Sequence, residues 1–333
     1  MMNDERNYNC IDLTRLLMAV LVIASHTGSV YGCTNPYILV PVHSIQQTSV
    51  LFFFLCTGFF LGKKMHACSA AGRERAVRDC LVKSVKQYVL WSAIYAPLAL
   101  VYFFRSGFSV RKSIVSYLQG FFLLGQNYNS WMLWYLLSCI YALVFLILLC
   151  RRNASPARMT LLGGVVYLLG LMLTEFLQYD GPLPAQAEGI HRLLATAIGT
   201  GRIFTGFFFL PMGMLLAEKK PGPRTGVLLF LCGFAGDILM EDVAGSLFRG
   251  LTAIGIFVTA AGIRLKNRPL YSTLREMSKI LYFTHMYVWT FYCTLVYGQE
   301  TLGFGSFLAT TLICLLIAYL FHAFSRRRHH AGL

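Results

Sequence analysis

Long apolar stretches, separated by short polar segments, recur along the whole chain. A helix that crosses the hydrocarbon core of a bilayer needs about 20 mostly apolar residues. Ten stretches approach that length. They cover residues 11–31, 46–62, 85–104, 130–150, 158–177, 201–217, 224–240, 245–263, 279–297 and 303–324. The pattern predicts an all-α, polytopic membrane protein with about ten transmembrane helices.

A further apolar piece, residues 114–125, is too short to cross a bilayer. Polar residues follow it, and then come Trp131 and Trp134, which is typical of the aromatic belt at a membrane interface. We therefore expect a short interfacial or re-entrant helix in this segment.

The composition agrees with a membrane protein, and the position of the charges predicts its direction. Hydrophobic residues make up 56% of the chain and charged residues 13%, against about 45–50% and about 25% in globular domains. When the connections are numbered alternately, one set holds 23 of the 29 Lys and Arg residues. The positive-inside rule makes that set cytoplasmic, which predicts that both termini are cytoplasmic. The net charge of +15 then reflects topology and contact with anionic membrane lipids, and we expect no nucleic-acid partner.

The ten cysteines are scattered, and no Cys-x-x-Cys pair occurs. We therefore expect neither a disulfide framework nor a metal site. We interpret residues 1–333 as a single membrane domain whose first apolar stretch is a retained helix. The acidic residues near the predicted outer helix ends are expected to be solvated interface residues: Glu175, Asp237, Glu241 and Asp242.

Ionisable residues inside a membrane span are costly and mark functional sites by default, and Arg15 and His26 lie in the first span. Arg15 and His26 are eleven residues apart, which places them on one helix face, about 16 Å apart along the axis. Histidine suits general base catalysis near neutral pH. The arginine fork suits a phosphate or an oxyanion. An interfacial anchor for Arg15 and a hydrogen-bonded core residue for His26 are the structural alternatives.

Four segments together resemble the acyltransferase-3 family of integral membrane acyltransferases. The first is the run 11–15 with His26, and the second is the phenylalanine-rich run 52–60, which contains Thr-Gly-Phe. The third is Trp-Met-Leu-Trp-Tyr-Leu at 131–136, and the fourth is Ser-x-x-x-Tyr-x-x-His at 278–285. The resemblance covers essentially the whole chain.

The resemblance implies a helical membrane enzyme that transfers an acyl group, commonly acetyl, from cytoplasmic acyl-CoA to a hydroxyl of a sugar-containing acceptor. The essential Arg and His of the family fall on Arg15 and His26. Basic positions that would bind the donor fall on Lys83 and Lys86, where the family often has Arg, so the bidentate fork is missing here. Thr57 stands where the family has Ser.

Three residues are expected along the substrate pathway: His285, Thr57 and Trp134. His285 has an alternative as a hydrogen-bond donor to a backbone carbonyl. Lys83 and Lys86 share one helix face and have an alternative as positive-inside anchors only. Arg202 is a candidate acceptor contact or an interfacial anchor.

We therefore predict an O-acyltransferase of the bacterial cytoplasmic membrane. Its donor substrate would be acyl-CoA, its acceptor a carbohydrate or glycolipid, and it would hold no permanently bound cofactor. His26 and Arg15 are the predicted catalytic residues. The alternative is a transporter or flippase for a small polar or lipid-linked solute, in which the same polar residues line the pathway. The sequence makes no prediction of the oligomeric state.

Overall fold

The computed structural model describes residues 7–240 and 242–330, and all regular elements in these ranges are helices. The chain forms two compact units. One comprises residues 1–53 and 221–333, and the other comprises residues 54–220. The long helix α2 (Pro36–His66) contributes to both, because the boundary falls between Phe53 and Phe54. The predicted cytoplasmic ends of the chain lie outside the described residues.

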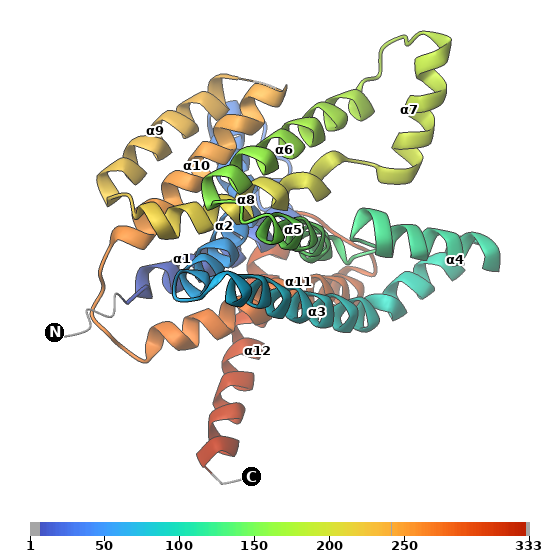
Figure 1. The fold of residues 1–333 in the computed structure, drawn as a ribbon. Coiled ribbons are helices and arrows are strands. Elements are labelled where there is room, and N and C mark those ends of the chain that lie inside the picture. Colours follow the sequence, from blue (N-terminus) through green and yellow to red (C-terminus); the bar gives the residue numbers. More distant parts are fainter. Residues whose placement is uncertain (1–6, 241, 331–333) are drawn as a thin grey trace, which may run out of the picture. The chain divides into compact units, whose positions relative to one another are not determined.

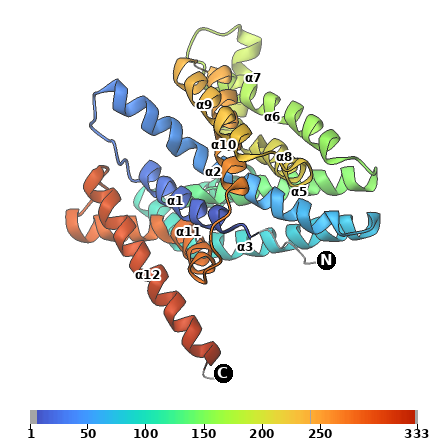
Figure 2. The same cartoon turned by 90° about the vertical axis from the view of Figure 1, so that its left-hand side faces the viewer.

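The first unit contains a closely packed helical hairpin. Helices α9 (Pro223–Leu239) and α10 (Asp242–Gly262) lie side by side in both views (Figure 1, Figure 2). Glycines permit this approach, because a Cβ atom on Gly226 would lie 2.5 Å from the backbone nitrogen of Thr259. Small residues at helix contacts are typical of packing in membranes.

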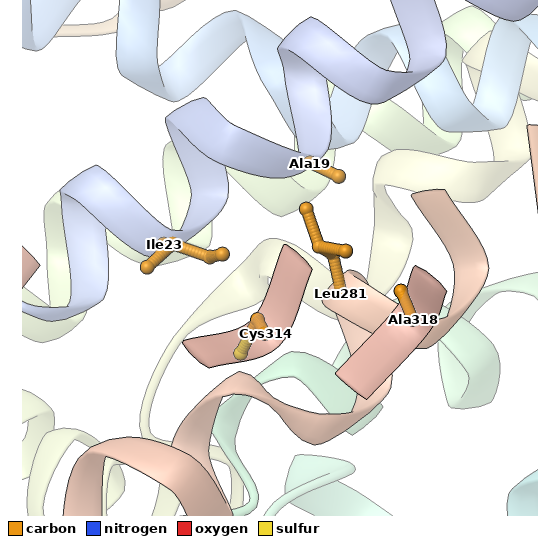
Figure 3. Close-up of a cluster of buried hydrophobic side chains, with 5 residues drawn as sticks. All are labelled: Ala19, Ile23, Leu281, Cys314 and Ala318. Carbon is orange, nitrogen blue, oxygen red and sulfur yellow. The ribbon is translucent and has the colours of Figure 1, made fainter. Parts of the chain in front are cut away.

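The same unit contains α1 (Asn9–His26), α11 (Leu270–Tyr297) and α12 (Phe304–His330). Figure 3 shows the side chains with which these three helices meet, and all five are fully buried: Ala19, Ile23, Leu281, Cys314 and Ala318. The small side chains in this cluster let the helices approach closely. The packing fixes α1 against α11, and these two helices carry Arg15, His26 and His285.

The second unit contains the rest of α2 and the helices α3 (Ala70–Arg105), α4 (Val110–Gln119), α5 (Trp134–Arg151), α6 (Pro156–Gln178), α7 (Ala185–Ile198) and α8 (Thr205–Lys219). A π-helical turn (Gly120–Leu124) follows α4, and 3-10 turns (Trp131–Leu133 and Gly201–Phe204) precede α5 and α8. Serines cap three helices, since Ser69, Ser109 and Ser155 each accept a backbone N–H of the first turn. Gly58 of α2 packs directly on the backbone of α8 at Leu210.

The all-helical fold is confirmed for the described residues, whereas the predicted number of spans is not. Within residues 7–240 and 242–330, seven helices are long and apolar enough to cross a membrane, or eight if the bent pair 186–198 and 201–219 forms one span. Each of the ten apolar stretches nevertheless lies mainly in a helix. The shortfall arises because α8 and α9 have only 15 and 17 residues, and because His, Tyr and Thr side chains interrupt the apolar half of α11.

Several predicted boundaries are wrong. The stretch 11–31 ends as a helix at His26, because Gly28 and Gly32 adopt positive φ angles of 68° and 81°. Helix α2 begins at Pro36 rather than at residue 46, so it includes His43. The connection between the predicted stretches 158–177 and 201–217 contains α7. The predicted short helix is present as α4 and the π-helical turn, and none of the residues of α4 is buried.

Candidate active site

Two histidines from α1 and α11 contact each other directly in the first unit. The Nδ1 atom of His26 lies 2.8 Å from the Nε2 atom of His285. The two rings stack with centroids 5.1 Å apart and planes 8° apart. His285 is fully buried, whereas His26 is partly exposed. Of the pair, His26 is therefore the residue that a substrate can reach.

The hydrogen bonds of His285 determine which nitrogen of each ring carries a proton. Its Nδ1 atom lies 2.9 Å from the carbonyl oxygen of Tyr282 and 3.1 Å from that of Leu281. A carbonyl oxygen only accepts, so Nδ1 of His285 carries a proton and, in the neutral ring, Nε2 accepts. The short contact then requires that Nδ1 of His26 donates. In this arrangement Nε2 of His26 is the unprotonated nitrogen, which is the form that a general base needs.

A carboxylate joins two arginines near the start of the same two helices. Nη1 of Arg15 lies 3.5 Å from Oδ1 of Asp12, and Nη1 of Arg275 lies 3.4 Å from Oδ2. Asp12 is buried, with 6% of its surface exposed. Since Asp12 contacts Arg275 and His26 contacts His285, α1 and α11 run parallel, with the arginines at their beginnings and the histidines further along.

A second cluster of polar and aromatic side chains lies in the other unit. Its residues come from α2, from α5 and from the segments before α5 and α8. The hydroxyl of Thr57 is 2.8 Å from that of Tyr135. Phe54 packs on both Tyr135 and Trp134, and the guanidinium of Arg202 lies 5.4 Å from the Trp134 ring. Arg202 also donates to the side-chain oxygen of Gln126. Thr57 and Trp134, both predicted pathway residues, are thus linked through the contact of Tyr135 with Phe54.

Lys83 and Lys86 are exposed on α3 of the second unit. The first unit carries Arg15, His26 and His285. Donor binding by the two lysines stays a prediction.

Among the predicted interface acids, Asp237 differs from the expectation. Its side chain is 1% exposed, and its oxygens lie 3.1 Å and 3.3 Å from Nη2 and Nε of Arg249. Ser44 donates a further hydrogen bond to it. The expectation of a solvated carboxylate is therefore wrong for this residue, while Glu241 lies outside the described residues.

Asp12 and Arg275 were not among the residues predicted for the site. Asp12 stands inside the quoted run 11–15, and an acidic residue in a membrane span is itself a signal. In the sequence, Arg275 is one of the basic residues on the predicted cytoplasmic side. The neighbouring sequence does not indicate its role, because its contact with Asp12 joins residues 263 positions apart in the chain.

Known proteins add three findings to this geometry. A family model for an acyltransferase domain, that of acyltransferase-3, matches residues 8–323. An amino-acid racemase of Enterococcus faecalis is 28% identical over 163 residues, which are 49% of this chain and 22% of that protein. A serine/alanine racemase of Enterococcus gallinarum is 23% identical over 292 residues, which are 83% of this chain and 40% of that protein.

The chain spans less than half the length of both curated relatives, so each of them contains a large part that this chain does not match. No solved structure matches the chain significantly.

Proposed function

The chain belongs to the acyltransferase-3 family, and we propose that it is a membrane O-acyltransferase. It moves an acyl group from acyl-CoA to a hydroxyl of a carbohydrate or glycolipid acceptor, and acetyl is the acyl group that we propose. The proposed location is the bacterial cytoplasmic membrane. The observation that carries this proposal is the contact between His26 and His285, which prepares a basic nitrogen on an accessible ring.

In the proposed reaction, Nε2 of His26 takes the proton of the acceptor hydroxyl as the oxygen attacks the thioester carbonyl carbon. A carbon–oxygen bond forms, and the carbonyl becomes a tetrahedral oxyanion. When this intermediate collapses, the carbon–sulfur bond breaks, and the imidazolium of His26 returns the proton to the departing CoA sulfur. His285 acts as a positioning residue, because its Nε2 accepts the Nδ1 proton of His26 and holds the ring in one tautomer.

The spacing along α1 favours one of the two roles considered for Arg15. Arg15 and His26 lie in the same uninterrupted helix, and eleven residues correspond to about 16 Å. A guanidinium so far from the base does not reach the oxyanion that forms beside it. We therefore assign Arg15 to the phosphate groups of the donor, for which its charge and multiple donors are suited. Lys83 and Lys86 are further candidates for these phosphates.

Purified protein in nanodiscs, supplied with radiolabelled acetyl-CoA and an envelope glycan fraction, tests the proposal. We expect label in an alkali-labile ester on the glycan. The variant His26→Ala should lose roughly 10²- to 10⁴-fold in rate, the usual contribution of a general base. His43→Ala is the matched control, since His43 is an exposed histidine of α2. Equal rates for wild type and His26→Ala would refute the mechanism.

The same preparation separates the enzyme from the transporter alternative. One relative is named a serine/alanine racemase, so labelled serine and alanine are suitable solutes for an uptake assay in proteoliposomes. Uptake without any consumption of acetyl-CoA would contradict the acyltransferase proposal. Acyl transfer without uptake would support it.

A further inference from the structure

Asp12 lies between two guanidinium groups at the end of the α1–α11 pair away from the histidines. The Asp12 side chain is 9% exposed, that of Arg15 16%, and that of Arg275 42%. Glu276 and Lys279 stand beside them and pair with each other at 2.9 Å. These five side chains together carry one net positive charge, so the cluster attracts anions.

The contacts within the cluster are not those of a closed salt bridge. Arginine and carboxylate normally pair through two parallel hydrogen bonds of about 2.7–2.9 Å. Here Asp12 engages one nitrogen of each arginine, at 3.5 Å and 3.4 Å. Arg275 otherwise faces Glu276, whose Oε1 is 3.7 Å from its Nε. Asp12 thus holds both arginines in place while using little of the hydrogen-bonding capacity of Arg275.

The beginning of α1 is fixed to the segment that leads into α11. The side-chain nitrogen of Asn7 donates to the carbonyl of Leu265 at 2.8 Å. That of Asn9 lies 3.3 Å from the carbonyl of Lys266. The two arginines therefore stand on helix ends that are held together at several points.

We propose that Arg275 is a second guanidinium of the donor site, that it binds a phosphate of acyl-CoA together with Arg15, and that Asp12 positions both. This inference rests on the proposed function, since it takes the donor to be acyl-CoA. Arg275 precedes His285 by ten residues of α11, about 15 Å, and Arg15 precedes His26 by eleven residues of α1, about 16 Å. An extended pantetheine arm bridges such a distance, so phosphates at the arginine pair place the thioester near the histidine pair.

Binding of acetyl-CoA and of S-acetylpantetheine to the purified protein, measured by calorimetry in a neutral detergent, tests this role. Acetylpantetheine lacks the nucleotide phosphates. We expect Arg275→Ala to weaken the binding of acetyl-CoA roughly tenfold or more, because a hydrogen bond to a charged group is lost. Binding of acetylpantetheine should stay unchanged. Arg268→Ala, which alters an exposed arginine of the preceding connection, is the matched control.

Two further variants separate a phosphate contact from a structural tie between the helices. Arg275→Lys keeps the charge and should recover part of the acetyl-CoA affinity. Asp12→Asn should weaken acetyl-CoA binding while leaving acetylpantetheine binding intact. If Arg275→Ala weakens the binding of acetyl-CoA and of acetylpantetheine equally, or lowers only the melting temperature, Arg275 only holds the two helices together. The inference is then wrong.

Anionic lipid headgroups offer the same chemistry, so a third arm uses vesicles containing phosphatidylglycerol. Binding to these vesicles that depends on Arg275, without any dependence for acetyl-CoA, would overturn the inference in favour of lipid. If the wild type binds no acetyl-CoA, the proposed function fails as well. If the wild type binds and transfers acetyl groups while Arg275→Ala and Arg268→Ala bind acetyl-CoA alike, only the inference fails.

Discussion

Replacing His285 by leucine removes the nitrogen that accepts the Nδ1 proton of His26, without introducing a charge. In the proposed reaction, Nε2 of His285 contributes most when His26 becomes an imidazolium. The hydrogen bond of 2.8 Å between the two rings then has a charged donor. Hydrogen bonds to charged groups contribute about 1.5–3 kcal/mol. At about 1.4 kcal/mol for each tenfold change, we expect His285→Leu to lower kcat roughly 10- to 150-fold.

His285→Gln is the matched variant, because the side-chain oxygen of glutamine reaches the position of Nε2 and can accept the same proton. It should retain more activity than His285→Leu. Initial rates of acetyl transfer at saturating donor give kcat, and calorimetry gives the affinity for acetyl-CoA, which should stay at the wild-type value in both variants. Equal kcat values for His285→Leu and wild type, in protein of unchanged melting temperature, would refute the tautomer argument.

Three other changes have predicted outcomes. Arg15→Ala should weaken the binding of acetyl-CoA by roughly tenfold or more, whereas Arg15→Lys should retain part of the affinity, and titration calorimetry measures both; an unchanged affinity would contradict the assignment of Arg15 to the donor. Asp237→Ala should destabilise the protein by about 3 kcal/mol, because it leaves the guanidinium of Arg249 without its buried partner; a thermal melt of the purified protein checks this, and an unchanged melting temperature would argue against a buried ion pair. Gly58→Ala should cost about 1–3 kcal/mol because its methyl group would collide with the backbone of α8, while Gly189→Ala, which meets no atom within 4 Å, should melt like the wild type.

The sequence predicted the helical class and identified the two histidines separately, but not their contact. His26 and His285 are 259 residues apart, and a pattern of apolar residues along each helix does not state which helices pack together. The same limit applies to Asp12 and Arg275. Arg275 gave no separate signal of a site in the sequence, because the positive-inside rule already explains a basic residue at a cytoplasmic helix end.

Helix ends were predicted less well than helix positions, for local reasons. The predicted stretch 11–31 runs beyond His26, but Gly28 and Gly32 take positive φ angles and end α1 earlier. The second predicted stretch begins at residue 46, whereas α2 begins at Pro36. Ser44 and Gln46 are buried there, since Ser44 pairs with Asp237 and Gln46 donates to Ser29 at 2.9 Å.

The variant His26→Asn distinguishes a general base from a residue that only donates a hydrogen bond to His285. Asparagine keeps a donor nitrogen near the position of Nδ1, so the hydrogen bond to His285 can persist while the basic nitrogen is lost. The measurement follows ester formed and CoA released in one reaction. We predict one ester per CoA in the wild type and a loss of roughly 10²- to 10⁴-fold in both for His26→Asn, at unchanged affinity for acetyl-CoA. Wild-type rates of ester formation in this variant would exclude His26 as the general base.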